Sequence, residues 1–480
     1  MKQILLFGAG KSATSLIRYL VHETAARDWQ LVVAENNLPL AESKIGPVPQ
    51  KPGSLPHARA VAVNVQDASQ RDALIKEADM VISLLPPALH YLVAGSCLQY
   101  KRNLLTASYL DPAIKALEKE IRDNGLLFLC EMGLDPGIDH MSAMELIAQV
   151  KEEGGQIHTF RSHTGGLVAP ESDDNPWHYK ISWNPRNVVL AGSAGAQYKE
   201  EGRIITRTYG ELFEKPGTVP VNGAGTLAWY PNRDSLSYIP IYGLEETATF
   251  IRTTLRYPDF CRAWAPIVRA GLTNDQSAVQ PARHANNAPD PADASSASLP
   301  PAPSPGLTFA AWSAPLLPYV NKDNRPQLEF LGLFDNSPVP TGAKTSADIL
   351  QYLLETRLAM QPQDKDMIVM QHEIGYTLPD AAPSTAQNTP RAPVPSPTGD
   401  ALEITSTLIV KGEDNLQTAM ARTVGLPLGI AAILILEGTI RTTGLHIPIL
   451  PEIYVPVLKE LEEQGIRFEK KIKNYITKIV

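Results

Sequence analysis

A Gly-rich turn near the start of the chain restricts the fold more than any other feature. Residues 4–7 are an apolar run typical of a buried strand, residues 8–13 read Gly-Ala-Gly-Lys-Ser-Ala, and apolar residues then recur at helical spacing. A second strand-like run, residues 31–34, ends at Glu35, about 20 residues beyond the turn, where a ribose-binding acid is expected. This order is the fingerprint of a dinucleotide-binding unit. Its candidate cofactor contacts are Gly8, Ala9, Gly10, Lys11 and Glu35.

Short strands and helical stretches go on alternating over the first quarter of the chain. Such alternation predicts a Rossmann-type, doubly wound parallel sheet, so we assign the chain to the α/β class. The strand at residues 79–85 ends in Leu84 and Leu85, which we expect along the nicotinamide side of the cofactor crevice. The other strand-like runs of this region are residues 60–63, 103–106 and 126–129.

Residues 131–140 form a second Gly-rich turn, placed between a strand and a helix. The strand is residues 126–129, and apolar residues three apart from Ile138 to Val150 lie on one face of the helix. The turn therefore falls at the carboxyl end of a strand, where open α/β sheets bind ligands. Asp135 stands in the middle of the turn, and we expect it either to cap the helix or to face a ligand.

The pattern then changes and predicts a mixed α+β unit. Residues 156–162 alternate as a strand, residues 163–167 read as a Gly turn, and a polar, aromatic loop of the lid or binding type follows at 169–179. Arg233 lies in a polar turn and Arg256 in a strand-like run. Both are candidate carboxylate clamps, because a guanidinium offers a bidentate fork.

Two segments, residues 274–305 and 379–400, are rich in Pro and Ala and contain almost no large apolar side chains. Such a composition cannot bury enough surface to offset the entropy of ordering, so we expect disordered surface insertions there. Replacing residues 274–305 by a short Gly/Ser linker is expected to leave activity intact.

Net charge, cysteine count and the length of the apolar runs indicate which partners and which cellular compartment to expect. The net charge of −8 argues against a nucleic-acid surface, which needs clustered Lys and Arg. There are 3 Cys and no CxxC pair, and the odd count favours a reducing compartment. An apolar strand follows Met1 without a leader, and the longest apolar run, residues 424–436, is shorter than the ~20 residues of a membrane span. The 10 His form no metal-binding motif. We therefore expect a cytoplasmic protein with no membrane partner and no metal.

Taken together, these motifs resemble those of the glutamate-forming saccharopine dehydrogenases, also called saccharopine reductases. The resemblance covers nearly the whole chain apart from the two Pro- and Ala-rich segments. It rests on residues 8–10, 106–109, 132–140, 165–171, 174–176, 179–180, 230–235, 254–257, 366–372 and 418–425.

The resemblance implies three segments. Residues 1–140 would form a dinucleotide-binding Rossmann domain, residues 141–440 an inserted mixed α+β substrate domain, and residues 441–480 a return to the Rossmann domain. It also implies an oxidoreductase acting on CH–NH donors. The implied reaction is the nicotinamide-dependent oxidation of saccharopine to glutamate and 2-aminoadipate 6-semialdehyde, or the reverse, in lysine metabolism.

The resemblance also implies the site residues. Hydride leaves the carbon beside a secondary amine, which must first be neutral, and the resulting imine takes up water. Asp135 or Tyr109 is expected to relay these protons. A substrate with three carboxylates suits Arg233 and Arg256. A further cofactor contact is expected at Leu134, and the substrate contacts match Ser108, Tyr109, Asp135, Arg233, Leu255, Arg256 and Tyr257.

The cofactor is expected to be NAD or NADP, with NAD favoured by Glu35. A carboxylate at this position binds the ribose hydroxyls of NAD and repels a 2′-phosphate. Asn36 and Asn37 follow it, where relatives that use NADP often show a basic residue, and Lys11 is the nearest basic residue in sequence.

Two alternatives to the main reading stay open. One is a carboxynorspermidine-type reductase that joins an amine and a carbonyl and needs fewer carboxylate clamps. The other is a protein that senses a dinucleotide without catalysis. For partners we expect the small-molecule substrate, saccharopine, no nucleic acid, and a homodimer as the candidate assembly.

Overall fold

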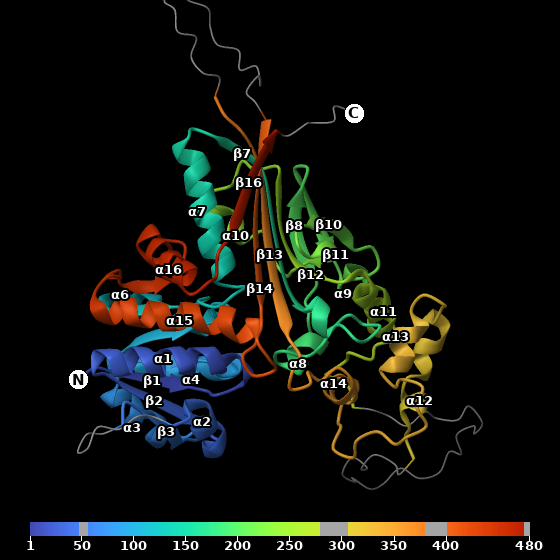
Figure 1. The fold of residues 1–480 in the computed structure, drawn as a ribbon, viewed down its shortest axis with the longest axis horizontal. Coiled ribbons are helices and arrows are strands. Elements are labelled where there is room, and N and C mark those ends of the chain that lie inside the picture. The colour runs from blue at the N-terminus through green and yellow to red at the C-terminus, as the bar shows by residue number, and fades with distance from the viewer. Residues whose placement is uncertain (48–55, 279–305, 380–400, 475–480) are drawn as a thin grey trace, which may run out of the picture.

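The computed structural model describes residues 1–47, 56–278, 306–379 and 401–474. The chain forms two units side by side: a parallel sheet with its helices, and a mixed sheet with a helical layer beyond it (Figure 1). The predicted insertions at residues 274–305 and 379–400 lie outside the described residues, apart from their edges.

The first unit is built on a seven-stranded sheet in which every neighbouring pair is parallel. The strand order changes direction at β1, which lies between β2 and β4, as in a doubly wound sheet. The predicted α/β class and Rossmann-type sheet are confirmed. Across the sheet the strands are β15 (Gly444–His446), β6 (Leu127–Leu129), β5 (Asn103–Thr106), β4 (Met80–Ser83), β1 (Gln3–Phe7), β2 (Gln30–Glu35) and β3 (Ala58–Ala62).

Helices cover both faces of this sheet. They are η1 (Lys11–Ala13), α1 (Thr14–Arg27), α2 (Leu38–Ile45), α3 (Ala68–Glu77), η2 (Pro87–Leu89), α4 (His90–Gln99), α5 (Pro112–Lys115), α6 (Glu118–Asp123), α15 (Ala419–Glu437) and α16 (Pro451–Glu463).

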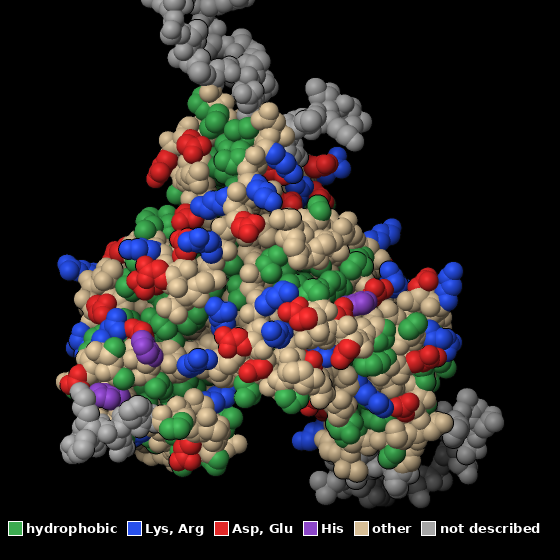
Figure 2. Space-filling model, viewed as in Figure 1, with side chains coloured by type: hydrophobic (Ala, Val, Ile, Leu, Met, Phe, Trp, Pro, Cys, Tyr) green, Lys and Arg blue, Asp and Glu red, His purple; other side chains and the backbone are tan. Residues whose placement is uncertain are grey.

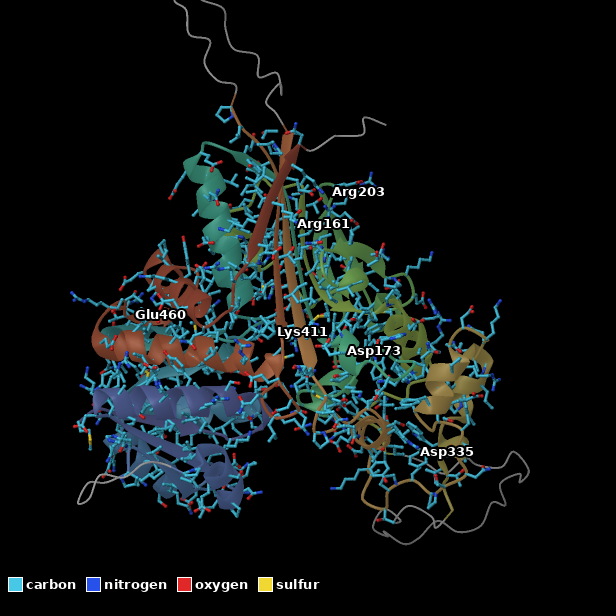
Figure 3. The ribbon with its side chains drawn as sticks, viewed as in Figure 1. Arg161, Asp173, Arg203, Asp335, Lys411 and Glu460 are labelled. Carbon is cyan, nitrogen blue, oxygen red and sulfur yellow. The ribbon has the colours of Figure 1, made fainter. Side chains whose placement is uncertain are left out.

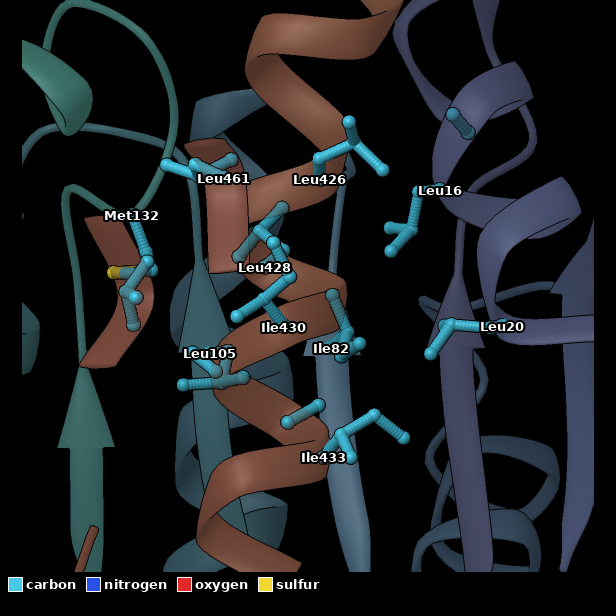
Figure 4. Close-up of a cluster of buried hydrophobic side chains, with 14 of the residues drawn as sticks. Leu16, Leu20, Ile82, Leu105, Met132, Leu426, Leu428, Ile430, Ile433 and Leu461 are labelled. Carbon is cyan, nitrogen blue, oxygen red and sulfur yellow. The ribbon is translucent and has the colours of Figure 1, made fainter. Parts of the chain in front are cut away.

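Alternate residues of β1 point to opposite faces of the sheet, and each face has its own core. Ile4 and Leu6 pack in a cluster with α1 and α15, part of which is shown in Figure 4. Leu5 and Phe7 pack in a cluster with α3 and α4. All four side chains are buried, which explains why β1 is continuously apolar in sequence.

α15 lies in the core of the first unit although it comes from the far end of the chain. Glycines let it approach α1 closely: a Cβ at Gly425 would lie 2.9 Å from the Cβ of Leu16, and one at Gly429 would lie 2.7 Å from the ring of Tyr19. The helix is long and apolar enough to cross a membrane, but 78% of that stretch is buried inside the protein, as in a core helix.

The second unit is built on a nine-stranded mixed sheet. β7 and β12 run parallel, and the other paired strands are antiparallel. Its main path is β10 (Gly217–Val221), β11 (Gly225–Pro231), β12 (Thr249–Arg256), β7 (Gln156–Val168), β13 (Asp366–Thr377), β14 (Ala401–Lys411) and β16 (Glu469–Asn474), with β8 (Ala196–Glu200) and β9 (Arg203–Arg207) attached at β12.

The Gly turn predicted at residues 163–167 is wrong, because β7 continues through it. A Cβ at Gly165 would come within 2.6 Å of the Cβ of Leu255 on β12. The glycine therefore allows a neighbouring strand to approach closely and does not make a turn. The final strand, predicted at residues 465–469, begins only at Glu469.

α7 (Ile138–Glu152) leads from the parallel sheet into the mixed sheet, and further helices complete the predicted α+β unit. Trp177 and Trp264 are fully buried among these helices and anchor their core. The helices are η3 (Pro170–Ser172), α8 (Pro185–Val189), α9 (Tyr209–Leu212), α10 (Tyr238–Tyr242), α11 (Pro258–Arg269), α12 (Phe309–Trp312), η4 (Ala314–Tyr319), α13 (Arg325–Phe330) and α14 (Ser346–Arg357).

The three predicted segment boundaries stay predictions. Two elements near the C-terminus, however, pack in a different unit from the one to which the predicted boundaries assign them. α15 falls within residues 141–440 yet packs on α1 of the first unit. β16 falls within residues 441–480 yet pairs with β14 of the mixed sheet. β15 does return to the parallel sheet, beside β6.

Charged side chains of both signs are interspersed over the face shown in Figure 2.

Ion pairs hold the polar loop at residues 169–179. Lys411, at the end of β14 (Figure 3), pairs with Glu171 at 2.8 Å. Asp173 pairs with His178 at 2.6 Å within the loop itself. The loop is therefore anchored at its start to the mixed sheet.

Candidate active site

The turn after β1 has the geometry of a dinucleotide site. Gly8 has a φ of +98°, and a Cβ there would lie 2.7 Å from the carbonyl oxygen of Leu84, so only glycine suits this position. A Cβ at Gly10 would meet nothing within 4 Å, which leaves room for a pyrophosphate at the start of α1. Ala9 is buried beneath the turn and Lys11 is exposed on it.

Glu35 ends β2 as predicted, but its carboxylate folds back onto the turn. It accepts hydrogen bonds from the amide of Ala9 at 2.8 Å and from the amide of Asn37 at 3.3 Å. Close by, the ammonium of Lys44 on α2 donates to the carbonyl oxygen of Gly10. Burial lowers the pKa of Lys44 to about 8, while the charge of Glu35 acts to raise it. The predicted ribose acid thus has a basic neighbour.

The three predicted leucine contacts follow strands of the same sheet. Leu84 and Leu85 come directly after β4, and the Leu84 amide donates to the carbonyl oxygen of Phe7 at 2.9 Å. Leu134 lies in the loop after β6 and is 5% exposed. Their contact with a cofactor stays a prediction.

The loop at residues 131–140 is wound tightly by its own backbone. The Gly133 amide donates to the carbonyl oxygen of Pro136 at 3.0 Å. Gly137 has a φ of +148°, and a Cβ there would clash with the backbone of Gly133, so glycine is required. The Gly137 amide donates to Asp139 Oδ1 at 2.6 Å. Asp139, in the first turn of α7, thus accepts from the amide of the N-cap residue Gly137, and Asp135 does not cap the helix.

Asp135 faces Arg252 of β12, the central residue of the site. One nitrogen of the Arg252 guanidinium, Nη2, lies 2.8 Å from Asp135 Oδ1 and 2.7 Å from Asp139 Oδ2. The Arg252 side chain is 2% exposed, and its guanidinium lies over the ring of Tyr238, 4.4 Å from the centroid. One buried cation therefore bridges two carboxylates.

The two carboxylates titrate differently. Burial and the charge of Asp139 raise the pKa of Asp135 to about 6, although Arg252 acts to lower it. Burial also disfavours the ionised form of Asp139, but His140 and Arg252 hold the pKa of Asp139 below its ordinary value. Asp139 is thus the permanent counter-ion of Arg252, and Asp135 is the group able to exchange a proton near neutral pH.

Tyr109, in the loop after β5, joins the same cluster. Its hydroxyl donates to Asp135 Oδ1 at 3.3 Å. Burial and the charge of Asp135 raise the pKa of Tyr109, so the phenol keeps its proton at neutral pH. The Arg233 guanidinium lies 5.0 Å from the centroid of the Tyr109 ring. The two predicted catalytic residues and one predicted carboxylate clamp are therefore brought together.

A buried hydrogen-bond network centred on Glu131 and His140 supports this cluster. Glu131 accepts from the Tyr238 hydroxyl at 3.0 Å and from the Leu110 amide at 3.0 Å. Its other partner is His140 Nε2 at 2.8 Å, and His140 Nδ1 lies 2.6 Å from the Tyr242 hydroxyl. The network joins the loops after β5 and β6 to α10, and so fixes the two sheets relative to one another.

Ser108 is connected to the cofactor side of the sheet. His90, at the start of α4, lies 2.8 Å from the Ser108 hydroxyl through Nε2 and 2.8 Å from the Ser83 hydroxyl through Nδ1. Burial lowers the pKa of His90 to about 4, so the ring is neutral at physiological pH. A neutral ring donates at one nitrogen and accepts at the other, which fixes both hydroxyls.

A pocket of about 430 Å³ opens beside Tyr109 and Arg233, a size suited to a small-molecule ligand. Arg207 of β9 and Arg252 also line it. Arg252 is neutralised by its carboxylates, whereas Arg207 and Arg233 form no ion pair within the described part of the chain. The pocket thus offers two arginines to an anionic ligand, and one carboxylate, Asp234, lines it as well.

Arg256 and its neighbours lie elsewhere. The Arg256 guanidinium is over the rings of Tyr179 and Phe260, 5.2 and 5.3 Å from their centroids. It donates to the Leu255 carbonyl at 2.8 Å, and its Nε has no partner among the described residues. Leu255 is buried in a separate apolar cluster, and Tyr257 is half-buried. None of these three residues lines the pocket, so their contact with substrate stays a prediction.

Arg252 and Lys44, two site residues that were not predicted, differ in whether a sequence pattern could have identified them. Arg252 stands four residues before Arg256 in an alternating strand, so both belong to one face, roughly 13 Å apart. A search for a second arginine on the same face of this strand could therefore have pointed to Arg252. No spacing rule joins Lys44 to Gly10, which lies 34 residues away on another element. The site residues not predicted are Glu131, Asp139, His140, Arg252 and Lys44.

A parallel sheet with a Gly-rich turn, joined to a mixed sheet that supplies an Arg-lined pocket, defines a dinucleotide-binding protein with a separate ligand-binding unit. Residues 4–129 match the family model described as the saccharopine dehydrogenase NADP binding domain. Residues 133–466 match the model described as the saccharopine dehydrogenase C-terminal domain. The chain belongs to the saccharopine dehydrogenase family, as its motifs predicted.

Individual relatives agree with the family models. The chain is 32% identical over 478 residues to saccharopine dehydrogenase [NADP(+), L-glutamate-forming] of Saccharomyces cerevisiae, covering 98% of this chain and 99% of the yeast protein. The solved apo structure of the yeast L-Glu-forming enzyme matches with a TM-score of 0.77 and 30% identity, covering 98% of this chain and 100% of that one.

Other relatives are longer. The chain is 34% identical to the mitochondrial alpha-aminoadipic semialdehyde synthase of Bos taurus, covering 97% of this chain but 47% of the bovine protein. The chain therefore spans about half the length of these relatives.

The comparisons also bear on the cofactor. A nicotinamide-cofactor domain is shown, but the preference for NAD inferred from Glu35 is not supported, because the matching model and the yeast relative are both described with NADP. Assembly and cellular compartment stay predictions.

Proposed function

We propose that this chain is an NADP-dependent oxidoreductase that acts on the CH–NH group of saccharopine and forms glutamate and 2-aminoadipate 6-semialdehyde, or catalyses the reverse. One observation carries the proposal. A titratable pair, Asp135 and Tyr109, lies at the carboxyl ends of the dinucleotide-binding strands and adjoins a pocket with two uncommitted arginines. The family relationship names a substrate that such a site fits.

Charge supports a substrate with several carboxylates. Arg233 and Arg207 line the pocket, and neither forms an ion pair within 4.0 Å among the described residues, although the charge of Arg207 acts to lower the pKa of Glu211. A guanidinium binds a carboxylate through two parallel hydrogen bonds, which fixes orientation as well as position. Saccharopine carries three carboxylates, so two pocket arginines can hold the ends of the molecule while its central amine lies near Tyr109.

The proton steps fall to Asp135 and Tyr109. Hydride transfer from the carbon beside the amine requires the amine nitrogen to be neutral, and Asp135, with its pKa raised to about 6, is ionised at pH 7 and able to accept that proton. Tyr109 keeps its proton and donates to Asp135 Oδ1, which orients the carboxylate. The iminium ion left by hydride transfer takes up water and loses one proton to solvent. Asp135 then returns its proton to the nitrogen of the resulting carbinolamine, and the C–N bond breaks to release the amine of glutamate and the aldehyde.

A bound nicotinamide supplies the hydride acceptor. The residues that would hold its dinucleotide are Gly8, Gly10 and the start of α1, where the turn leaves space for phosphates. Glu35 is bonded to the backbone of that turn and has Lys44 beside it, so the repulsion expected for a 2′-phosphate is reduced. NADP is therefore the cofactor we propose.

Steady-state turnover with purified protein tests this proposal. Saccharopine with NADP should give reduced cofactor, whereas carboxynorspermidine should give none. Faster turnover with carboxynorspermidine would favour the amine–aldehyde reductase alternative. Tight NADP binding without turnover of either substrate would favour a sensing role.

A further inference from the structure

The Gly-rich turn has a cation that comes from a different element. Lys44 lies in the last turn of α2, and its ammonium donates to the carbonyl oxygen of Gly10. Gly10 is the position where a pyrophosphate has room to approach. Lys44 therefore stands at the rim of the expected cofactor site.

The present partner of Lys44 is weak compared with an anion. A neutral carbonyl oxygen forms a weaker bond to an ammonium than a charged oxygen does. The nearby carboxylate of Glu35 directs its two oxygens to the amides of Ala9 and Asn37, at 2.8 and 3.3 Å. Lys44 is half-buried, so its ammonium is also incompletely hydrated. It is suited to exchange its carbonyl partner for an anionic one.

The position of Lys44 matches one part of NADP. In a Rossmann site the adenosine ribose lies at the end of the second strand, where Glu35 stands, and a 2′-phosphate projects from that ribose. The basic residue that usually receives this phosphate is absent here, because Asn36 and Asn37 follow Glu35. Lys44, on the helix that follows β2, brings a cation back to the same end of the strand.

We propose that Lys44 recognises the 2′-phosphate of NADP and sets the preference of this chain for NADP over NAD. On binding, its ammonium leaves the Gly10 carbonyl for the phosphate, a movement that the flexible four-carbon stem of lysine permits. Lys11, exposed on the turn, adds to the positive field. The inference rests on the proposed nicotinamide cofactor and is independent of the substrate.

Calorimetric titration with two small nucleotides tests it without turnover. Adenosine 2′,5′-bisphosphate contains the 2′-phosphate, and adenosine 5′-monophosphate lacks it. Lys44→Met should weaken binding of the bisphosphate by about 10- to 100-fold, the loss expected for a charge-assisted hydrogen bond, and change monophosphate binding by less than about twofold. Lys44→Arg should keep the preference. Lys76→Met removes a lysine from the last turn of α3 and should change neither titration.

The outcomes separate this inference from the proposed function. Equal weakening of both nucleotides in Lys44→Met would place Lys44 at the pyrophosphate and overturn the inference. Unchanged bisphosphate binding, or a wild type that binds neither nucleotide, would also overturn it. A Lys44-dependent preference in a protein that does not oxidise saccharopine would support the inference and contradict the proposed function.

Discussion

Arg252 determines the electrostatics of the site at the scale of single residues. A buried guanidinium needs one carboxylate for neutrality, and this one has two, Asp135 and Asp139. Two carboxylates on one cation cannot both be fully stabilised, so their pKa values move apart. Asp139 keeps its charge, and Asp135, which accepts a hydrogen bond from the pocket residue Tyr109, is the carboxyl group with the raised pKa.

Replacing Arg252 by Met should therefore destabilise the fold strongly. The change leaves two buried carboxylates without a cation, at an expected cost of about 3–5 kcal/mol in the free energy of unfolding. Arg262→Met, which removes an exposed pair with Asp259, should cost less than about 1 kcal/mol. Urea denaturation of both variants measures the difference, and equal effects would show that Arg252 does not hold a buried ion cluster.

Asp135→Asn should change how stability depends on pH. The folded pKa of Asp135, about 6, lies above its ordinary value of 3.8, so between these values the folded protein binds more protons than the unfolded one. This group therefore makes the wild type lose stability as pH rises from 4 to 6. The variant lacks that loss and should gain stability relative to wild type over this interval, by an amount on the order of 2 kcal/mol.

Asp139→Asn is the matched control for this experiment, with the opposite sign. The pKa of Asp139 is held low in the fold, so its contribution is present above its ordinary pKa and lost as pH falls. Between pH 4 and 6 the difference in unfolding free energy from wild type should change steeply for Asp135→Asn and less for Asp139→Asn, whose own contribution is lost only below about pH 4. Equal changes in the two variants would contradict the assignment of Asp135 as the group with the raised pKa.

Arg233→Met tests the proposed carboxylate clamp. Its loss should raise the KM for saccharopine by about 10- to 100-fold, because a charge-assisted bidentate pair is removed, with kcat changed much less. Arg203→Met, on the exposed end of β9 (Figure 3), is the control and should leave both constants unchanged. An unchanged KM in Arg233→Met would remove this residue from the substrate site.

At the scale of elements, the contact between α1 and α15 depends on glycine. A Cβ at Gly425 would meet the Leu16 backbone nitrogen at 2.9 Å, whereas Gly95, exposed inside α4, has nothing within 4 Å. Gly425→Ala should therefore cost about 1–3 kcal/mol of unfolding free energy, and Gly95→Ala should stabilise by up to about 1 kcal/mol. Thermal unfolding compares the same substitution in two helices. Stabilisation by both would show that the helices are not in close contact.

Most strands of the first unit were predictable because a strand that is buried on both faces is continuously apolar in sequence. Strands β1, β2, β4, β5 and β6 were all predicted from such apolar runs. Gly165 shows where prediction from local sequence fails. The residues around a glycine do not reveal whether it allows two strands to pack closely or makes a turn. Only the neighbouring strand, 90 residues later in sequence at Leu255, decides between them.

At the scale of the whole molecule, the site exists because two sheets meet. Asp135 and Tyr109 come from loops of the parallel sheet, and Arg252 and Arg233 come from the mixed sheet. Motifs pointed to the residues within each unit. Pairings across the junction, such as Asp135 with Arg252, depend on register and docking that no local pattern records. The sequence therefore pointed to Arg256 and gave no reason to prefer Arg252.

The two sheets together form the site that we propose oxidises saccharopine with NADP. The most direct test measures the reduced nicotinamide formed and the glutamate released in the same reaction of purified protein with saccharopine and NADP. We expect one glutamate for each reduced cofactor, with a higher kcat/KM for NADP than for NAD. Reduced cofactor without glutamate, or no reaction with either cofactor, would contradict the proposed function.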